Sequence, residues 1–236
     1  MPQVRTALVT GGTRGIGAAT AAALARAGYR VIATGTSREG KGPDGCSYLR
    51  CDFSDLEATE AFAATVSTLE VSVLVNNAGV NVVGPLAGYE LKDFLRIQQV
   101  NVTAPFLLCR AVLPGMQKRR YGRIVNITSI YGLVSRAGRS AYSTSKFGLF
   151  GLSRALALEV AQDNILVNCL APGIVETDLT RHILGDHGLS EIVTRIPVGR
   201  LAQPDEIAHY IAFLVSEENT YLTGQQIVVD GGYTCG

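Results

Sequence analysis

The chain has 236 residues, 47% of them hydrophobic, and its formal charge is 21 − 20 = +1 at pH 7. This length suffices for one large domain with a sizeable hydrophobic core. No apolar run approaches the roughly 20 residues that a membrane-spanning helix needs. No basic block is typical of a nucleic-acid or membrane surface, and the first residues lack a signal-peptide pattern. We therefore expect neither a nucleic-acid nor a membrane partner.

The cysteines and histidines bear on location and on metal binding. The five cysteines, at positions 46, 51, 109, 169 and 235, include no C-x-x-C pair. An odd number of thiols without metal-ligand spacing, in a chain without a targeting segment, favours reduced cysteines and a cytoplasmic location. The three histidines share no metal-binding spacing either, so we expect no metal site.

From the amino terminus onward, short β-branched runs alternate with longer amphipathic stretches. The runs predict strands at 6–10, 31–34, 48–51, 73–75, 123–128, 165–170 and 227–230. The longer stretches predict helices at about 15–28, 55–69, 92–119, 142–162 and 204–216. Strands that are apolar on both faces and alternate with helices indicate a parallel sheet covered on both sides. The prediction is an α/β fold, a single Rossmann-type doubly wound domain of about seven strands that binds ligands at their carboxyl ends.

A glycine-rich loop follows the first strand, with the sequence T-G-G-T-R-G-I-G from Thr10. Gly11 permits a sharp exit from the strand, Gly15 leaves room for a pyrophosphate beside the backbone, and Gly17 lets helix and strand pack closely. The free N–H groups at the N-terminus of the next helix favour phosphate. The spacing is neither G-x-G-x-x-G nor that of a P-loop, but the position of the loop predicts a dinucleotide site.

The end of the second strand bears on which dinucleotide binds. An acid about 20 residues after the glycine loop usually binds the ribose 2′-hydroxyl of NAD. Here the chain reads T-G-T-S-R, with no carboxylate. Thr36 and Ser37 could donate hydrogen bonds to a 2′-phosphate, and Arg14 and Arg38 could supply positive charge. Either arginine could equally be a solvated surface residue. We therefore expect NADP(H) to be preferred over NAD(H).

A tyrosine and a lysine stand one turn apart where a long apolar helix is expected to begin, in Y-S-T-S-K from Tyr142 to Lys146. This spacing places both side chains on one face of the helix. The pKa of free tyrosine, about 10, is too high for efficient proton exchange near neutrality, and a neighbouring ammonium favours the phenolate. A core tyrosine beside a snorkelling lysine is the structural alternative.

Four motifs occur in order: the glycine loop, N-N-A-G from Asn76, Ser129 after the fifth strand, and the pair Tyr142 and Lys146. Together they make the chain resemble the short-chain dehydrogenase/reductases over essentially its whole length. The pattern is closest to the 3-oxoacyl-[acyl-carrier-protein] reductase branch of that family. Taken alone, Ser129 is best interpreted as a helix cap and Asn101 as a turn residue. The joint occurrence of all these motifs at strand ends favours the functional interpretation.

The resemblance implies roles for four catalytic residues. Tyr142 would protonate a carbonyl oxygen as hydride arrives, and Ser129 would hold that oxygen. Lys146 would also bind the nicotinamide ribose, and Asn101 would join a water relay behind it. The implied cofactor contacts, besides Tyr142 and Lys146, are Gly11, Thr13, Arg14, Gly15, Ile16, Gly17, Thr36, Ser37, Arg38, Asp52, Phe53, Asn77, Ala78, Gly79, Pro172, Gly173, Val175 and Thr177. Asp52 would meet the adenine, with capping of the next helix as its alternative.

The substrate pocket is expected along residues 80–84 and 130–136, beneath a covering segment at about 178–198. The composition of the first two stretches predicts a mostly apolar pocket with a few polar contacts. We expect an NADPH-dependent enzyme acting on CH–OH groups, and the residues at positions 163 and 81–83 favour a small ketone or alcohol as its substrate. A carrier-bound 3-oxoacyl chain and a diol or sugar stay open as alternatives. A dinucleotide-binding regulator without turnover is the rival from another class.

Two positions bear on the carrier-bound alternative. Carrier-dependent reductases of the resembling branch dock the acidic carrier through basic residues near the active-site mouth, at positions that match Arg120 and Asp163. Arg120 keeps the charge, but Asp163 reverses it and should repel an acidic partner. Asn81, Val82 and Val83 also stand where those reductases commonly carry T-R-D.

The helices expected at about 92–119 and 142–162 are apolar on more than one face, as in F-L-L-C from Phe106 and F-G-L-F-G-L from Phe147. One face can cover the sheet, and the excess apolar surface is best buried against another subunit. A thicker core would produce the same pattern. We expect a homotetramer.

Overall fold

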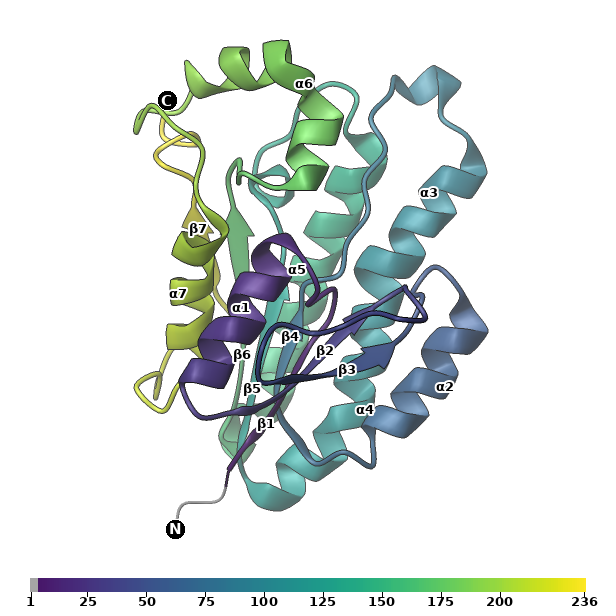
Figure 1. Cartoon of the computed structure of the whole chain (residues 1–236), viewed down its shortest axis with the longest axis vertical. Coiled ribbons are helices and arrows are strands. Elements are labelled where there is room, and N and C mark those ends of the chain that lie inside the picture. Colours follow the sequence, from purple (N-terminus) through teal and green to yellow (C-terminus); the bar gives the residue numbers. More distant parts are fainter. Residues whose placement is uncertain (1–3) are drawn as a thin grey trace.

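The computed structural model describes residues 4–236, and its centre is one seven-stranded sheet (Figure 1). The strands are β1 (Thr6–Val9), β2 (Arg30–Gly35), β3 (Cys46–Arg50), β4 (Val71–Asn76), β5 (Gly122–Ile127), β6 (Ile165–Pro172) and β7 (Gln226–Val229). They lie in the order β3-β2-β1-β4-β5-β6-β7, and every neighbouring pair is parallel. The order reverses between β1 and β4, where doubly wound sheets bind their ligands. The predicted fold class is confirmed.

Helices cover both faces of the sheet. They are α1 (Gly15–Arg26), α2 (Leu56–Val66), α3 (Leu91–Gln98), α4 (Ala104–Arg119), α5 (Ser140–Val160), α6 (Asp178–Val193) and α7 (Pro204–Val215). α1 and α7 pack against each other and share one core cluster, whereas α2, α4 and α5 pack on the opposite cluster (Figure 1). Strands β4, β5 and β6 are buried along their whole length between these layers, as apolar residues on both faces require.

The structure differs from the sequence prediction between residues 92 and 119. Instead of one helix, α3 and α4 are joined by a π-helical turn, η2 (Gln99–Thr103). A π turn adds one residue to the helical ring, and such turns occur frequently at functional sites. Here the extra residue lets the buried side chain of Asn101 reach the backbone of Val80. Periodicity alone could not reveal this turn, because the flanking helices keep the apolar pattern.

Helix α6 was not predicted as a helix, although it lies within the expected covering segment. Thr177 caps it by accepting a hydrogen bond from the backbone N–H of Thr180 at 3.2 Å. Gly185, with φ of +61°, kinks the helix in the middle. The kink divides the apolar pattern into two short pieces, and this is why periodicity did not indicate a helix. α6 lies at the end of the molecule where the strands terminate (Figure 1).

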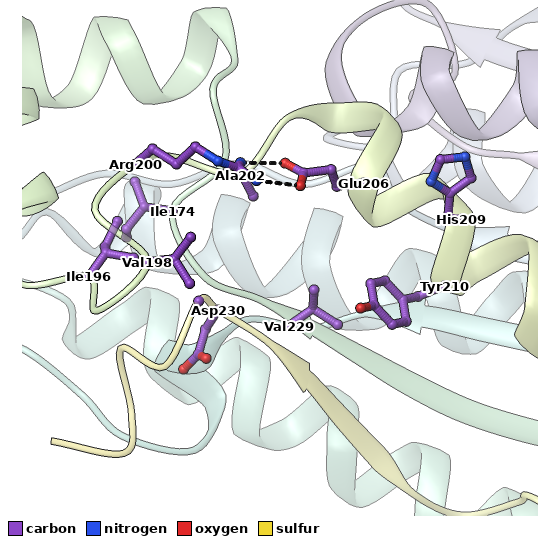
Figure 2. Close-up of a pocket in the computed structure, with 11 residues that line it drawn as sticks. Ile174, Ile196, Val198, Arg200, Ala202, Glu206, His209, Tyr210, Val229 and Asp230 are labelled. Carbon is purple, nitrogen blue, oxygen red and sulfur yellow. Dashed lines mark hydrogen bonds and ion pairs between the residues drawn. The ribbon is translucent and has the colours of Figure 1, made fainter.

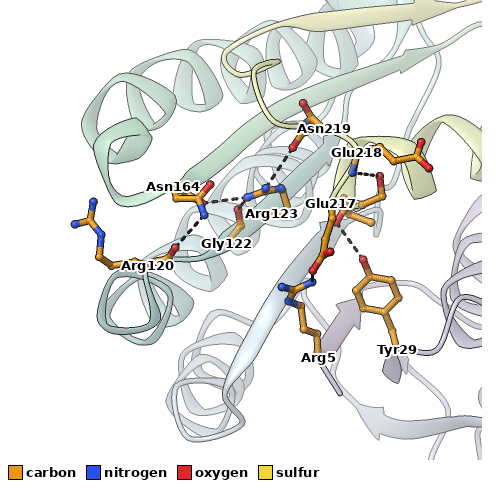
Figure 3. Close-up of polar contacts among 11 residues, drawn as sticks. Arg5, Tyr29, Arg120, Gly122, Arg123, Asn164, Glu217, Glu218 and Asn219 are labelled. Atoms are coloured by element: carbon orange, nitrogen blue, oxygen red, sulfur yellow. Dashed lines mark hydrogen bonds and ion pairs between the residues drawn. The ribbon is translucent and has the colours of Figure 1, made fainter. Parts of the chain in front are cut away.

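Buried polar contacts hold the amino ends of the strands (Figure 3). Arg123, near the start of β5, is only 4% exposed, and its guanidinium donates to the carbonyl oxygens of Asn164 at 3.0 Å and Asn219 at 3.2 Å. Arg5 pairs with Glu217 in the same region. These contacts join β1 and β5 to the turn before β6 and to the segment after α7. They lie at the edge of the sheet opposite the ligand-binding edge.

Candidate active site

The glycine loop between β1 and α1 adopts a conformation that side chains would disturb. Gly11 and Gly15 have φ of +61° and +53°, in the left-handed region that favours glycine. A Cβ on Gly17 would collide with the Gly11 carbonyl oxygen, so helix and strand are in direct backbone contact there. A Cβ on Gly15 would lie 3.1 Å from the Thr177 methyl group. The loop therefore lies beside the segment that follows β6.

The loop is tied to the N-N-A-G segment after β4 by Thr10, a residue that the sequence analysis did not select. Its hydroxyl accepts hydrogen bonds from the backbone N–H groups of Asn77 and Ala78, both at 2.9 Å. The Asn77 amide donates to the carbonyl oxygens of Thr10 at 2.9 Å and Gly11 at 3.1 Å. The signal was a threonine directly before the first glycine of the loop. These bonds fix the two loops at the switch point of the sheet.

Exposed polar side chains gather at the N-terminus of α1 and the end of β2: Thr13, Arg14, Thr36, Ser37 and Arg38. Arg14 makes no capping hydrogen bond, so the first N–H groups of α1 remain available. Among the described residues, neither Arg14 nor Arg38 has a carboxylate within 4.0 Å. Arg50, which the sequence analysis missed, donates to the Thr36 carbonyl oxygen at 3.0 Å. Open N–H groups, bare glycine backbone and unpaired guanidinium groups fit a phosphorylated dinucleotide.

Asp52 and Phe53 follow β3 at the same edge of the sheet. The Asp52 carboxylate accepts hydrogen bonds from the backbone N–H of Ser54 at 3.0 Å and from its hydroxyl at 2.7 Å, and these bonds lower its pKa. Asp52 is not the cap of α2, because Asp55 holds that position. Phe53 is buried against Phe62, with ring centroids 5.8 Å apart. Asp52 therefore stays exposed at the surface, while Phe53 anchors the turn in the core.

The segment Pro172–Thr177 continues from β6 toward α6. Gly173 lies so close to the chain after β7 that a Cβ would be 2.7 Å from the Cα of Asp230. Val175 forms a parallel bridge with Ala202 and is buried. These contacts hold the segment against the sheet edge, where its last residue reaches Gly15 of the glycine loop.

Lys146 and Tyr142 lie on one face of α5, and Lys146 is only 4% exposed. The Lys146 ammonium donates to the Ile127 carbonyl oxygen at 2.7 Å and lies 5.5 Å from the centroid of the Tyr142 ring. Burial lowers the pKa of Lys146 to about 8. A Cβ on Gly79 would lie 3.7 Å from the Lys146 Nζ and 3.5 Å from the Asn101 Oδ1. The ends of β4 and β5, η2 and α5 therefore meet at this lysine.

Asn101 links three segments from within the π turn. Its Oδ1 accepts from the backbone N–H of Val80 at 2.9 Å, and its Nδ2 donates to the Val80 carbonyl oxygen and to the Ser145 hydroxyl, both at 3.0 Å. Both of its N–H groups are therefore used inside the protein. The residue fixes the loop after β4 relative to α5.

Ser129 follows β5 and caps η3 (Ile130–Gly132), because its Oγ accepts from the backbone N–H of Tyr131 at 3.2 Å. Its hydroxyl proton remains free to be donated elsewhere. Burial raises the pKa of Tyr142, and the Ser129 hydroxyl and the positive charge of Arg139 oppose this rise. Lys146 was expected to favour the phenolate; its ammonium gives one of its three N–H groups to the Ile127 carbonyl oxygen and lies 5.5 Å from the centroid of the Tyr142 ring.

Arg139 was missed by the sequence analysis, although it stands three residues before Tyr142. It lies directly before α5 and is buried. The signal that could have found it is a basic residue in the loop immediately ahead of the Y-x-x-x-K pattern. The loop itself is held by Gly132, where a Cβ would lie 3.1 Å from the backbone of Lys146.

A cavity of about 420 Å³ lies apart from these residues, between the 196–202 chain, α7 and β7 (Figure 2). Arg200 and Glu206 form a two-bonded ion pair at its rim, with both N···O distances at 2.7 Å. Figure 2 shows Ile196 and Val198 on the same side as Arg200, with His209 and Tyr210 on the other side. No residue of the stretches 80–84 and 130–136 lines this cavity. The cavity therefore shares only Ile196 and Val198, of the expected covering segment, with the expected substrate pocket.

Arg120 and Asp163 lie at the other edge of the sheet from Ser129. Arg120 ends α4 just before β5, and Asp163 stands just before β6, so both are at the amino ends of parallel strands. The two side chains form an ion pair, with Nη1 of Arg120 3.3 Å from Oδ1 of Asp163. The expectation that they flank the active-site mouth is therefore wrong within one subunit. The charge of Arg120 is also matched by its neighbour.

Three further observations concern the described part of the chain. Within residues 4–236, no group of three or more His, Cys, Asp or Glu side chains is arranged to hold a metal ion. In the same range, no helix is both long enough and apolar enough to cross a membrane. All five cysteines are free thiols.

Comparisons with known proteins place the chain among relatives over nearly its full length. A family model described as enoyl-(acyl carrier protein) reductase matches residues 11–234. The 3-oxoacyl-[acyl-carrier-protein] reductase of Vibrio cholerae is 39% identical over 236 residues, which are 97% of this chain and 96% of that protein.

Solved structures agree with the sequence comparisons. A protein of Beutenbergia cavernae, assigned as an NAD(P)-dependent gluconate 5-dehydrogenase and solved with NADP at low occupancy, has a TM-score of 0.92 and 36% identity, covering 98% of this chain and 97% of that one. A protein described as a short chain dehydrogenase/reductase has a TM-score of 0.89 and 33% identity, with coverage of 98% and 97%. The chain therefore belongs to the short-chain dehydrogenase/reductase family and is an oxidoreductase that acts on carbonyl and CH–OH groups.

Proposed function

We propose that the protein is an NADPH-dependent oxidoreductase that interconverts a small free carbonyl compound and its secondary alcohol. The observation that carries the proposal is the meeting of Ser129, Tyr142 and Lys146 at the carboxyl edge of the sheet, beside the glycine loop. Such a juxtaposition provides a proton donor, a hydrogen-bond donor and a buried amine in one place.

In the proposed mechanism, Ser129 and Tyr142 act on the carbonyl oxygen. NADPH, when bound, supplies the hydride that the carbonyl carbon receives. The Ser129 hydroxyl donates a hydrogen bond to the oxygen, since its own lone pair already accepts from Tyr131. Tyr142 transfers its phenolic proton to the same oxygen, which completes the secondary alcohol. Lys146, with its pKa lowered to about 8, can pass a proton from solvent toward the phenolate. In the reverse direction the phenolate accepts the proton.

The cofactor contacts belong to the same proposal. The glycine loop and the N-terminus of α1 would hold the pyrophosphate, Asp52 and Phe53 the adenine, and the N-N-A-G segment the adenosine ribose. The Pro172–Thr177 segment would hold the nicotinamide carboxamide. Lys146 would bind the nicotinamide ribose, and α6 would cover the substrate.

The preference for NADP(H) rests on the chain around the end of β2. Residues 34–38 contain no carboxylate to repel a 2′-phosphate, Arg14 and Arg38 are exposed, and Arg50 donates to the Thr36 carbonyl oxygen. We expect higher kcat/KM with NADPH than with NADH, and we expect Arg14→Ala to reduce that ratio. Equal or higher catalytic efficiency with NADH would contradict the preference.

A carrier-bound 3-oxoacyl thioester is the second candidate substrate. The 39% identity to the Vibrio cholerae reductase favours it, whereas the Arg120–Asp163 pair leaves no free arginine charge at those two positions for an acidic carrier. The test compares a carrier-bound substrate with its small thioester analogue, with and without Asp163→Arg. Strong preference of the unmodified enzyme for the carrier-bound form would overturn the small-substrate proposal; a gain confined to the arginine variant would support it.

The decisive experiment for the activity is a panel of ketones, 3-oxoacyl thioesters, diols and sugar acids, followed by NADPH absorbance in both directions. Turnover of small carbonyl compounds supports the proposal. Binding of NADPH without turnover of any member would instead favour a non-catalytic dinucleotide-binding regulator. We also propose a homotetramer and, from the five free thiols, a cytoplasmic location.

A further inference from the structure

One arginine beside the proposed proton donor has no acidic partner. Arg139 is 7% exposed. Among the described residues, no carboxylate lies within 4.0 Å of its guanidinium. Buried charges are ordinarily paired, because their removal from water is costly. Arg123, the other strongly buried arginine, is held by backbone carbonyl oxygens. Arg139 has no such partners: most of its side chain is buried, but its nitrogens keep contact with solvent.

The guanidinium of Arg139 lies close to the proposed catalytic residues. Its Cζ is 5.3 Å from the centroid of the buried Tyr131 ring, and Tyr131 is two residues after Ser129. Its charge also acts on Tyr142 and Tyr89, where in each case it opposes the rise in pKa that burial causes. The arginine therefore faces one phenol ring and acts electrostatically on two other phenols. One of them is the group that would protonate the substrate.

The nitrogens of Arg139 remain open to a ligand. The Nε of Arg123 is sealed from solvent without a partner, whereas no nitrogen of Arg139 is sealed in this way. The next residue, Ser140, begins α5, and the first N–H groups of that helix add positive potential beside Arg139. An unpaired guanidinium and a helix N-terminus together favour an anion.

We propose that Arg139 binds a carboxylate of the substrate, so that the substrate class is a small oxo acid reduced to a hydroxy acid. This inference rests on the proposed function. A guanidinium holds a carboxylate through two parallel N–H···O bonds, which fixes the orientation of the bound molecule. The substrate carbonyl is then left to Ser129 and Tyr142. The carbon gains the hydride, the oxygen gains the Tyr142 proton, and the carboxylate is unchanged.

The test uses oxo acids of increasing chain length with the carbonyl at successive positions, each beside its methyl ester. Initial rates of NADPH oxidation are measured for the unmodified enzyme, Arg139→Gln and the control Arg26→Gln. Arg26 is an exposed arginine at the end of α1, outside the site. We expect kcat/KM for the best acid to exceed that of its ester by about 10²-fold, the scale of a lost charged hydrogen-bond pair. Arg139→Gln should bring this ratio close to one, and Arg26→Gln should preserve it.

The other outcomes separate the role of Arg139 from the proposed function. If the esters are turned over as efficiently as the acids, carboxylate recognition by Arg139 is excluded, but the result still supports a carbonyl reductase. An equal loss on acids and esters, with a shifted pH profile, would mean that Arg139 acts only on the Tyr142 phenol. If no carbonyl compound is turned over, the proposed function fails, and calorimetric titration of the oxo acids into the enzyme–NADP⁺ complex decides the arginine's role. Binding that Arg139→Gln abolishes would then support the inference; absence of binding would overturn it.

Discussion

Tyr142 is the residue on which the proposed chemistry depends most directly. Replacing it with phenylalanine removes one oxygen and leaves the ring packing in place. We expect Tyr142→Phe to retain the fold and NADPH binding but to lose about 10²-fold or more in turnover, the usual scale for a general acid. The measurement is kcat under conditions where chemistry limits the rate, with fluorescence titration of NADPH as the control. Near-normal turnover would exclude Tyr142 as the proton donor.

Lys146 makes a prediction about stability as a function of pH. Burial lowers its pKa from 10.5 to about 8, so between these values the unfolded chain holds a proton that the folded chain has lost. The free energy of unfolding therefore rises with pH across this window, and the full cost of burial is present below pH 8. Lys146→Met removes this dependence.

The expected result concerns the difference between the two proteins without cofactor. From pH 7 to pH 10 the unmodified apoenzyme should gain about 2.5 kcal/mol relative to Lys146→Met, at 1.36 kcal/mol per pKa unit. Urea unfolding at pH 7, 8, 9 and 10 provides the measurement, and the variant controls for every other titrating group. A difference that stays constant over this range would show that the pKa of Lys146 is not lowered.

At the scale of elements, the π turn between α3 and α4 is the feature that positions Asn101. Asn101→Ala would leave the backbone N–H and carbonyl groups of Val80 without their partners, and the Ser145 hydroxyl without its donor. We expect a loss of about 1–3 kcal/mol in the free energy of unfolding, together with lower kcat. Chemical denaturation and steady-state kinetics measure both. Ser145→Ala, which removes the hydroxyl that accepts from Asn101 but leaves both Val80 bonds, should cost less; equal losses would mean that the Val80 bonds contribute little.

The helices and strands also show which features of the fold a sequence pattern can predict. The strands, most helices and the glycine loop could be predicted, because each depends on periodicity or on residues that are neighbours in the chain. The turn at Gln99–Thr103 and the kink at Gly185 could not, because both are set by contacts with distant segments. The Arg120–Asp163 pair and the burial of Arg139 likewise depend on how separate elements meet.

At the scale of the whole molecule, the exposed apolar faces of α4 and α5 support the proposed tetramer. Phe106 is 45% exposed and Phe147 is 47% exposed on these helices. We expect Phe106→Glu to reduce the assembly to dimers or monomers, because a buried carboxylate without a partner is costly. Light scattering coupled to gel filtration gives the mass. Leu86→Glu serves as the control, because Leu86 is an exposed apolar residue away from these helices, in the 3-10 turn η1 (Leu86–Gly88). A monomer at micromolar concentration for the unmodified protein would rule the tetramer out.

The packing of α1 against α7 has a consequence for how the chain reaches this structure during its synthesis. The first helix emerges from the ribosome early, but its partner on that face of the sheet begins only at Pro204. Until then Leu24 and the outer side of β1 have no cover from Ile207 and Ile211, which share their core cluster. The glycine loop stands at the start of α1, so it cannot be fully supported before the chain from Pro204 onward is made. A nascent chain arrested before residue 204 should therefore be protease-sensitive in its amino-terminal half and fail to retain NADPH, even though nearly every residue that would touch the cofactor has already been translated.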